Sequence, residues 1–256
     1  MIKEIAKHVF WSLPYETRRI LFKVSCPRAY QKLQALRTVE VGKGQTLMPF
    51  DKYQCIFVHI PKCAGISVCN SLFGGEAGWH MQIRKYQLAF TKSEFESYLK
   101  FTFVRNPWDR LVSAYCFLKK GGMGQVDKKW AEENLSIYPD FDSFVKSWIN
   151  RKNIFSYTLF IPQYKFICTQ GHLPTLDFIG FFENLEEDFS YVQERIKTNQ
   201  SDLLFLNKTT NRKDYQKYYT EESKQIVAEV YKEDIQMLGY TFDNSSLNAQ
   251  LAKRNI

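Results

Sequence analysis

A lone lysine in a short loop is the first feature of this sequence that could do chemistry. The apolar run Ile56–Ile60 stops at a proline, Lys62 follows, and small residues precede Ser67, which opens an amphipathic segment. This order predicts a strand, a tight loop and a helix N-terminus. Such a turn directs backbone N–H groups and one ammonium at a single point, so it suits a phosphate or sulfate-like anion. It is not a Walker A loop, because that loop has its lysine at the end rather than at the start.

A second strand-to-helix turn offers a guanidinium. The apolar run Phe101–Val104 ends at Arg105, and Pro107 suits the first turn of a helix that carries Ser113. Arg105 presents a planar fork to a phosphate, and Ser113 follows about two helical turns later, where its hydroxyl could join the same anion. Two such turns suit a ligand with two anionic groups, such as a nucleotide phosphorylated at both ends.

The two segments, HIPKCAGIS and FVRNPWDRLVSAY, resemble the paired 5′- and 3′-phosphate-binding motifs of the carbohydrate sulfotransferases. The nearer match is the branch that contains the heparan and chondroitin sulfotransferases and their bacterial relatives. The resemblance continues in DFIGFFENLEEDF, LNKTTNRKDY and YYTEESKQIVAEVYKEDIQMLGY, and so covers roughly Tyr53 to Tyr240. It implies sulfuryl transfer from 3′-phosphoadenosine 5′-phosphosulfate (PAPS) to a carbohydrate hydroxyl, a fold like that of P-loop nucleotide kinases, and no metal.

The resemblance also implies roles for individual residues. Lys62 matches the lysine that contacts the phosphosulfate and stabilises the departing oxygen. Cys63 and Ile66 stand where the family often has threonine, so two hydroxyl contacts are missing. The positions matched to nucleotide binding are Lys62, Cys63, Ala64, Gly65 and Ser67 at the 5′-phosphate, Arg105 and Ser113 at the 3′-phosphate, and Lys208 and Thr209 in a loop that closes over the nucleotide.

Sulfuryl transfer also requires a base for the acceptor hydroxyl. The chain has four histidines. His80 is the predicted base, because it follows the anion loop and matches a histidine that the family often carries there. His59 falls in the apolar run and is expected to be buried and hydrogen-bonded, whereas His172 and His8 have no predicted role in the reaction.

Each of these side chains also has a purely structural explanation. Lys62 could be a solvated loop lysine, Arg105 could pair with Asp109, and Ser113 could lie on a helix surface. The segment that contains Lys208 could be a solvated basic loop.

Three further residues have open alternatives. His80 could simply pack beside Trp79. Glu183 could orient His80, but a charge that complements a helix N-terminus is favoured. Gln163 is a possible acceptor contact.

Composition limits the remaining choices. A chain of 256 residues can form one domain with a substantial core. The formal charge of +8 suits polyanionic ligands such as PAPS or an acidic glycan, and no nucleic-acid module is recognisable. Six cysteines without CxxC or metal-ligand spacing indicate buried thiols in a reducing compartment and no metal site.

The start of the chain has neither a secretory signal pattern nor a run long enough to span a membrane. We therefore expect a bacterial cytoplasmic enzyme, or alternatively a trimmed Golgi-lumenal domain. Residues 1–37 are expected to form a peripheral helical segment packed on the core, although contact with a membrane surface is the alternative. The sequence does not indicate an oligomeric state.

Alternating strands and helices predict an α/β fold, with a parallel sheet covered by helices on both faces in three layers. Ligands of such sheets bind beyond the carboxyl ends of the strands. Ser93 is expected to cap a short helix, and Met123–Pro139 to be a polar, mobile segment that faces the acceptor. Expected strands are 54–60, 101–104 and 177–182, and expected helices lie within the first 37 residues and near 66–72, 107–119, 141–150, 159–168, 185–197 and 221–237. The expected domains are a helical extension (1–52), the sulfotransferase domain (53–242) and a tail (243–256).

Two other functions fit parts of the pattern. A nucleotide or small-molecule kinase of related fold would need a Walker lysine and a Mg²⁺-binding aspartate, and the sequence shows neither. A non-catalytic module that binds polyanions through its basic surface would need no donor site at all.

Overall fold

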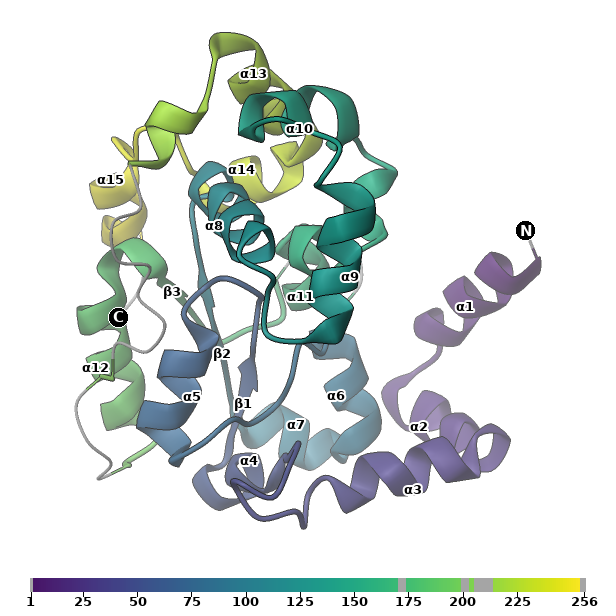
Figure 1. The fold of residues 1–256 in the computed structure, drawn as a ribbon. Helices are drawn as coiled ribbons and strands as arrows, with labels where there is room; N and C mark the ends of the chain where they lie inside the picture. The colour runs from purple at the N-terminus through teal and green to yellow at the C-terminus, as the bar shows by residue number, and fades with distance from the viewer. Residues whose placement is uncertain (1, 170–173, 199–202, 205–213, 254–256) are drawn as a thin grey trace. The chain divides into compact units, whose positions relative to one another are not determined.

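The computed structural model describes residues 2–169, 174–198, 203–204 and 214–253 (Figure 1). The chain divides into two compact units. The first unit comprises Met1–Ile60, Ala64–Phe103 and Lys165–Asn207, and the second comprises Pro61–Cys63, Val104–Tyr164 and Lys208–Ile256.

A three-stranded parallel sheet forms the centre of the first unit, which confirms the predicted α/β class. Phe57 of β1 lies opposite Phe101 of β2 in the register of the two strands. All four residues of β1 are buried, as expected for a parallel sheet that is covered on both faces. The strands, in spatial order, are β1 (Cys55–Val58), β2 (Leu99–Val104) and β3 (Phe178–Phe181).

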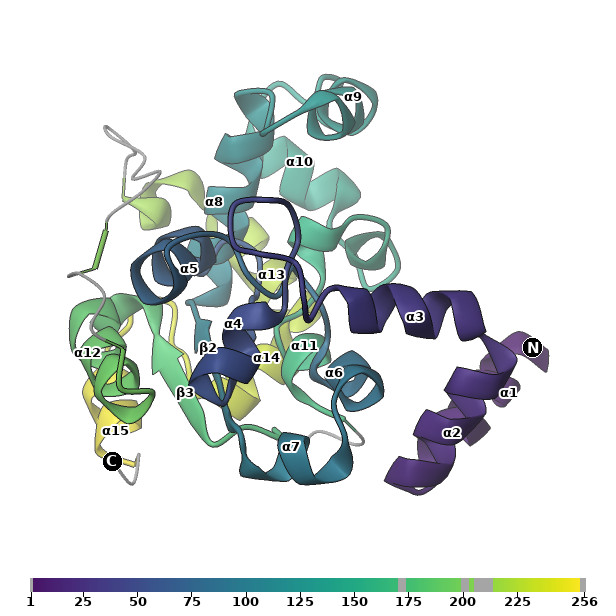
Figure 2. The same cartoon turned by 90° about the horizontal axis from the view of Figure 1, so that it is seen from below.

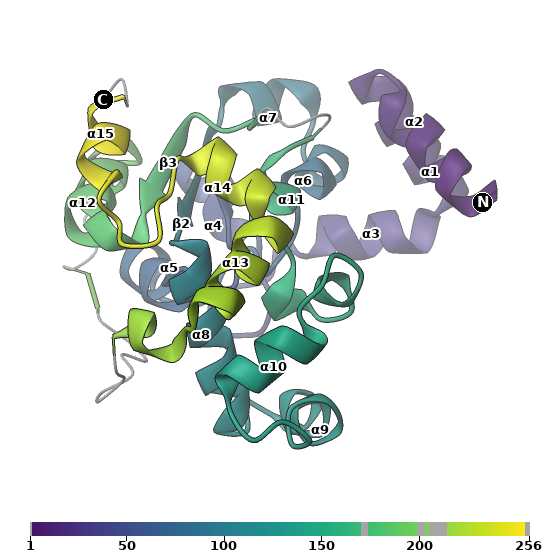
Figure 3. The same ribbon diagram turned by 90° about the horizontal axis from the view of Figure 1, so that it is seen from above.

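Helices cover both faces of this sheet. Figures 2 and 3 show α5 (Gly65–Phe73) on one face and α6 (Ile83–Ala89) and α7 (Lys92–Ser97) on the other. α4 (Met48–Tyr53) leads into β1, and α12 (Leu185–Arg195) packs on β3. The sheet therefore has the three-layer arrangement that the alternation of strands and helices predicts.

The first residues form three short helices: α1 (Ile2–Ser12), α2 (Tyr15–Ser25) and α3 (Pro27–Ala35). We call residues 2–35 the N-terminal arm. Prolines separate its helices because a proline cannot donate the backbone bond of a helix interior. The arm packs on α6 through Arg18, which is buried and donates a 2.6 Å hydrogen bond to Gln87 Oε1.

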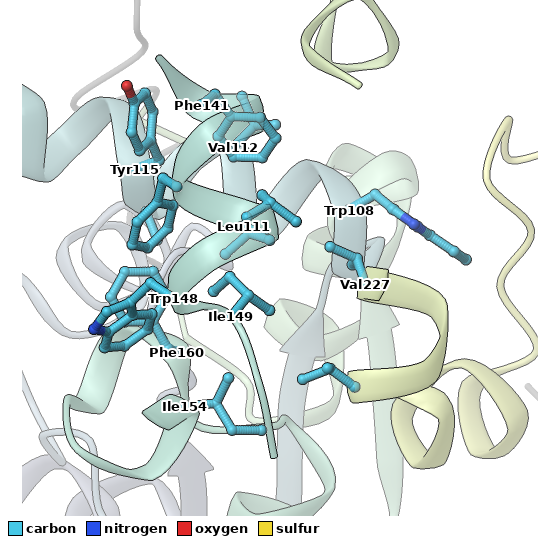
Figure 4. Packing of buried hydrophobic residues seen from close by; sticks show 14 of the residues in the cluster. Trp108, Leu111, Val112, Tyr115, Phe141, Trp148, Ile149, Ile154, Phe160 and Val227 are labelled. Carbon is cyan, nitrogen blue, oxygen red and sulfur yellow. The ribbon is translucent and has the colours of Figure 1, made fainter. Parts of the chain in front are cut away.

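An aromatic core fills the second unit (Figure 4). Leu111, Val112 and Tyr115 of α8 (Pro107–Lys119) contribute to it at helical spacing. The ring of Phe144 stacks on that of Trp148 within α10, with a centroid separation of 5.3 Å. The other elements of this unit are α9 (Gln125–Asn134), α10 (Phe141–Trp148), α13 (Glu221–Val230), α14 (Lys232–Leu238), α15 (Leu247–Ala252) and the 3₁₀ turns η1 (Asn153–Phe155), η2 (Thr158–Phe160) and η4 (Tyr215–Tyr218). α11 (Tyr164–Ile167) and the 3₁₀ turn η3 (Phe182–Asn184) complete the described elements of the chain.

Several sequence predictions are wrong in detail. The polar segment 123–139 contains helix α9, because Trp130 stacks on Tyr157 with a centroid separation of 4.6 Å and anchors it. Thr91, not Ser93, caps α7, since it forms a reciprocal capping box with Glu94. The helix expected near 159–168 is interrupted before α11, as a proline at position 162 favours. The long final helix is divided at position 231 into α13 and α14.

Candidate functional site

The loop after β1 has an unusual backbone. Lys62 and Ala64 both have left-handed φ values, +68° and +61°. Non-glycine residues rarely adopt this region, and they concentrate at binding and catalytic sites. Ala64 is the N-cap of α5 and has no side-chain oxygen to bind the first N–H groups of the helix. This N-terminus is therefore suited to an anion, as the sequence predicted.

A histidine packs against the start of α5. The ring of His59 stacks on that of Phe57, with centroids 5.7 Å apart, and is buried as expected. A Cβ atom added to Gly65 would lie 1.9 Å from His59 Cδ2, so the loop passes the imidazole only because residue 65 is a glycine. Burial, and secondarily the neighbouring His80, lowers the pKa of His59 well below 6.5, so this imidazole stays neutral.

His80 is held by the backbone of His59. Its Nδ1 atom lies 3.1 Å from the His59 carbonyl oxygen, and the two rings meet edge to face at 4.4 Å between centroids. Because a carbonyl oxygen only accepts, Nδ1 is the donor of this bond, and the lone pair of the neutral ring is then on Nε2. This is the tautomer that a general base requires. His80 belongs to the first unit and Lys62 to the second, so their action in one reaction stays a prediction.

Lys62 and Arg105 are in direct contact within the second unit. Arg105 Nη1 donates a 3.1 Å hydrogen bond to the backbone carbonyl of Lys62. The same guanidinium is paired with Asp109, from Nε at 2.8 Å and from Nη2 at 2.7 Å. The pairing with Asp109 that the sequence left open is therefore present. Both nitrogens bind the same oxygen, Asp109 Oδ2, and these two charge-assisted contacts hold the guanidinium of Arg105 next to the lysine loop.

Helix α8 connects the two cations through one of its faces. Asp109, Ser113 and Phe117 follow one another at intervals of four residues, so they share a face of the helix. Asp109 binds the Arg105 guanidinium, and the Lys62 ammonium lies 3.9 Å from the centre of the Phe117 ring. Ser113 is thus placed between the two contact points, which are about 12 Å apart along the helix axis.

A buried glutamine joins the lysine loop to the end of β2. Gln163 Oε1 accepts from the Arg105 backbone N–H at 2.9 Å and from Cys63 Sγ at 3.4 Å, and Nε2 donates to the Arg105 carbonyl at 2.8 Å. Gln163 is completely buried. This burial is contrary to the predicted acceptor contact and makes Gln163 a positioning residue instead. Cys63 is buried too, so only its backbone can serve a nucleotide.

Two charged residues hold this arrangement from inside the second unit. Asp234 accepts from the backbone N–H of Gln163 at 2.7 Å and from that of Tyr164 at 2.8 Å. Arg110 donates from Nε to the Pro61 carbonyl at 3.1 Å, which fixes the beginning of the lysine loop. Burial raises the pKa of Asp234 to about 6, although Arg110 opposes the shift.

Sequence reasoning missed four of these residues. Asp109 follows Arg105 by four residues along a helix, and this spacing could have indicated a carboxylate that orients the guanidinium. Among the sequence expectations, Asp109 is only an alternative partner that would keep Arg105 from a phosphate. Nothing in the local sequence marks the others, which are Phe117, Arg110 and Asp234, because their partners lie far away in the chain.

The remaining predicted residues are less informative. Ser67 is buried in the first turn of α5. Glu183 lies in a 3₁₀ turn just before α12, which agrees with the favoured helix-terminal explanation. Lys208 and Thr209 lie outside the described residues, as does His172.

The described residues hold neither a metal-binding cluster nor a membrane-spanning helix. Within them, no group of three or more His, Cys, Asp or Glu side chains could hold a metal ion. No described helix has both the length and the apolar character needed to cross a membrane. Burial raises the pKa of Cys69 to about 12, so this thiol is unreactive at neutral pH.

Comparisons with known proteins bear on the family of the chain. Residues 45–241 match the family described as the Sulfotransferase family, which is more than half of the chain. An uncharacterised protein of Archaeoglobus fulgidus is 41% identical over 107 residues, which are 41% of this chain and 72% of that protein. No solved structure matches the chain significantly.

Proposed function

This chain belongs to the Sulfotransferase family, and we propose that it moves the sulfuryl group of PAPS to a hydroxyl of a carbohydrate or glycan. The contact between Lys62 and Arg105 is the observation that carries the proposal. The Arg105 guanidinium contacts the backbone of the lysine loop, and both cations meet one face of α8, where Asp109 binds Arg105 and Phe117 contacts the Lys62 ammonium. A nucleotide phosphorylated at both ends requires two such cations. The proposed catalytic domain spans residues 53–242.

We assign the donor contacts as follows. Arg105, oriented by Asp109, binds the 3′-phosphate together with Ser113. The backbone N–H groups of the loop and of the α5 N-terminus bind the 5′-phosphate. The nucleotide-binding residues are Lys62, Cys63, Ala64, Gly65, Ser67, Arg105, Ser113, Lys208 and Thr209.

The reaction is an in-line displacement at sulfur. The acceptor oxygen forms a bond to sulfur while its proton passes to Nε2 of His80. The bond between sulfur and the 5′-phosphate oxygen breaks, and its electron pair remains on that oxygen. Lys62 stabilises the negative charge that develops there, since an ammonium is worth most where charge appears in the transition state.

Two features of the sequence support a carbohydrate as the acceptor. The resemblance of the two anion-binding motifs is to carbohydrate sulfotransferases, and the net charge of +8 suits an acidic glycan. Six cysteines without CxxC or metal-ligand spacing favour a reducing compartment such as the bacterial cytoplasm.

Nucleotide binding and transfer test the proposal separately. Calorimetric titration should show that adenosine 3′,5′-bisphosphate (PAP) binds without Mg²⁺ and that ATP binds poorly. A kinase would show the reverse, and a simple polyanion-binding module would bind neither nucleotide. Transfer of ³⁵S from labelled PAPS to a panel of polysaccharides, oligosaccharide lipids and small alcohols then identifies the acceptor.

Lys62→Ala provides the matched test of the mechanism. We expect transfer to fall at least about 100-fold, because the leaving oxygen loses its cation. Lys119→Ala, which changes an exposed lysine on α8, should retain full activity. Equal activity of the two variants would contradict the assigned role of Lys62.

A further inference from the structure

The positive charge of the chain is concentrated in its first residues. The N-terminal arm, residues 2–35, contains seven lysines and arginines and two glutamates, a net charge of +5, whereas the whole chain has 35 basic and 27 acidic residues and a net charge of +8. The proposed nucleotide site lies elsewhere in the sequence. The basic character of the N-terminal arm therefore has no explanation in the binding of PAPS.

Helix α2 of this arm exposes its aliphatic side chains. Ile20, Leu21 and Val24 are 60%, 43% and 73% exposed. Their spacings of three and four residues place them on one stripe of the helix. Val9 of α1 adds a further exposed aliphatic side chain at 53%.

The inward face of α2 carries an arginine instead. Arg18 is buried and binds Gln87 Oε1 as well as the backbone carbonyls of Trp11 and Leu13. A surface helix in water normally buries its aliphatic stripe and exposes its cations. In α2 the inward side carries Arg18 together with the aromatic Tyr15, whose ring meets that of Phe95, while the aliphatic stripe is left in solvent. The stripe is therefore suited to an apolar environment outside the protein. Figures 1 and 2 show α1, α2 and α3 together at one end of the first unit, away from its sheet.

Exposed cations accompany the aliphatic stripe. Lys23 lies next to Ile20 around α2, and Arg28 and Lys32 are exposed one turn apart on α3. An acidic glycan would pair with these cations but would leave the aliphatic side chains in water. A second copy of the arm would cover the stripe but would bring like charges together. A bilayer with anionic lipids satisfies both features, because it offers an apolar interior beneath a negative surface.

We propose that the N-terminal arm docks the protein on an anionic membrane surface. Ile20, Leu21 and Val24 enter the boundary between headgroups and acyl chains, while Arg28 and Lys32 contact the anionic headgroups. The arm lies on the membrane and does not cross it. This inference does not depend on the sulfuryl-transfer proposal.

Co-sedimentation with lipid vesicles tests the docking. The full chain should pellet with vesicles of phosphatidylcholine mixed with phosphatidylglycerol, and much less with phosphatidylcholine alone. Added salt should weaken the binding, because it screens the headgroup charge. Ile20→Ser/Val24→Ser should lower the vesicle partition coefficient at least about tenfold, since two aliphatic side chains no longer leave water. Arg28→Glu/Lys32→Glu should abolish the preference for phosphatidylglycerol.

Matched changes in the second unit provide the controls. Val126→Ser/Ile137→Ser removes two aliphatic side chains that are 76% and 70% exposed. Lys128→Glu/Lys129→Glu reverses two exposed charges on α9. Both controls should bind vesicles like the unmodified protein, and circular dichroism should confirm that every variant is folded.

Three outcomes would overturn the proposal. The first is a failure of the unmodified chain to bind anionic vesicles. The second is binding that Ile20→Ser/Val24→Ser leaves unchanged, which would indicate nonspecific attraction by charge. The third is a dimer in analytical ultracentrifugation that this variant dissociates, with no vesicle binding, which would make the stripe a contact between two copies of the chain.

Discussion

Arg105 donates a hydrogen bond from Nη1 to the backbone carbonyl of Lys62, at 3.1 Å. The side chain of one proposed phosphate ligand therefore supports the backbone of the other. Lys62 has a left-handed φ of +68°, which costs free energy unless surrounding contacts hold it. Changes at Arg105 should consequently affect both ends of the nucleotide site.

Arg105→Lys tests the guanidinium fork. A lysine keeps the charge but cannot bind Asp109, the Lys62 carbonyl and a phosphate at the same time. We expect the dissociation constant for PAP, measured by calorimetry, to rise about 10- to 100-fold, because charge-assisted hydrogen bonds are lost. Arg151→Lys is the control, since Arg151 is exposed and binds Glu229 of α13 and Glu233 of α14, away from the lysine loop in sequence. Unchanged PAP affinity in Arg105→Lys would refute the 3′-phosphate role.

Gln163→Leu tests the buried connection between the lysine loop and β2. The substitution removes the partners of the Arg105 backbone N–H and carbonyl. We expect chemical denaturation to show a loss of about 1–3 kcal/mol for each buried group left without a partner, together with weaker PAP binding. Gln225→Leu, an exposed change on α13, should alter neither quantity by a measurable amount. If Gln163→Leu behaves in the same way as this control, the glutamine does not position the site.

His80→Ala tests the general base. We expect the turnover number on the true acceptor to fall by about 10²–10⁴, because no side chain receives the acceptor proton. PAP affinity should stay within about twofold, since the base contacts the acceptor and not the nucleotide. His8→Ala, an exposed change in α1, is the control. Turnover near that of the unmodified enzyme would assign the base to another group.

Gly65→Ala tests the close approach of the loop to His59. The added Cβ would lie 1.9 Å from the imidazole, so we expect the free energy of unfolding to fall by about 1–3 kcal/mol. His59→Ala/Gly65→Ala should lose less than the sum of the single changes, because the ring that causes the clash is absent. Gly124→Ala is a matched control with no atom within 4 Å of its Cβ. Strict additivity would show that the ring does not require the glycine.

The buried imidazole of His59 should make the fold sensitive to mild acid. Its pKa is lowered from 6.5 by burial, so the unfolded chain binds a proton more readily than the native protein. The free energy of unfolding should therefore fall as the pH drops below about 6.5, by up to about 1.4 kcal/mol per pH unit from this group. Urea denaturation over that range should show a shallower dependence for His59→Leu. If stability depends on pH in the same way in both proteins, the pKa of His59 is not lowered in the native state.

Local sequence patterns correctly predicted the helices and strands nearest the site. The apolar run ending at Val104 and the proline at position 107 predict a helix over 107–119, and α8 has those bounds. Both signals act through neighbouring residues: an apolar run favours a buried strand, and proline restricts its own backbone. The lysine, arginine and histidine candidates were recognisable for the same reason, since each stands at a break between elements.

The same reasoning failed where distant residues decide the outcome. Segment 123–139 is polar in sequence, yet α9 forms because Trp130 meets Tyr157 from another part of the chain. Thr91 displaces Ser93 as the cap of α7 because only Thr91 reaches the N–H of Glu94 while the Glu94 side chain binds back. Arginine side chains are usually exposed to solvent, but Arg18 is buried and binds Gln87.

By itself, the sequence determined the α/β class, the two strand-to-helix turns and the membership of the chain in a sulfotransferase family. Those features depend on residue types and on spacings between residues that are close together in the sequence. Only the tertiary structure decided that Gln163 joins Cys63 to Arg105 and that one face of α8 contacts both Lys62 and Arg105. It likewise decided that α2 exposes its aliphatic face. Each of these requires two segments to meet in space, and the free energy of such contacts is set by burial and geometry that no local pattern contains.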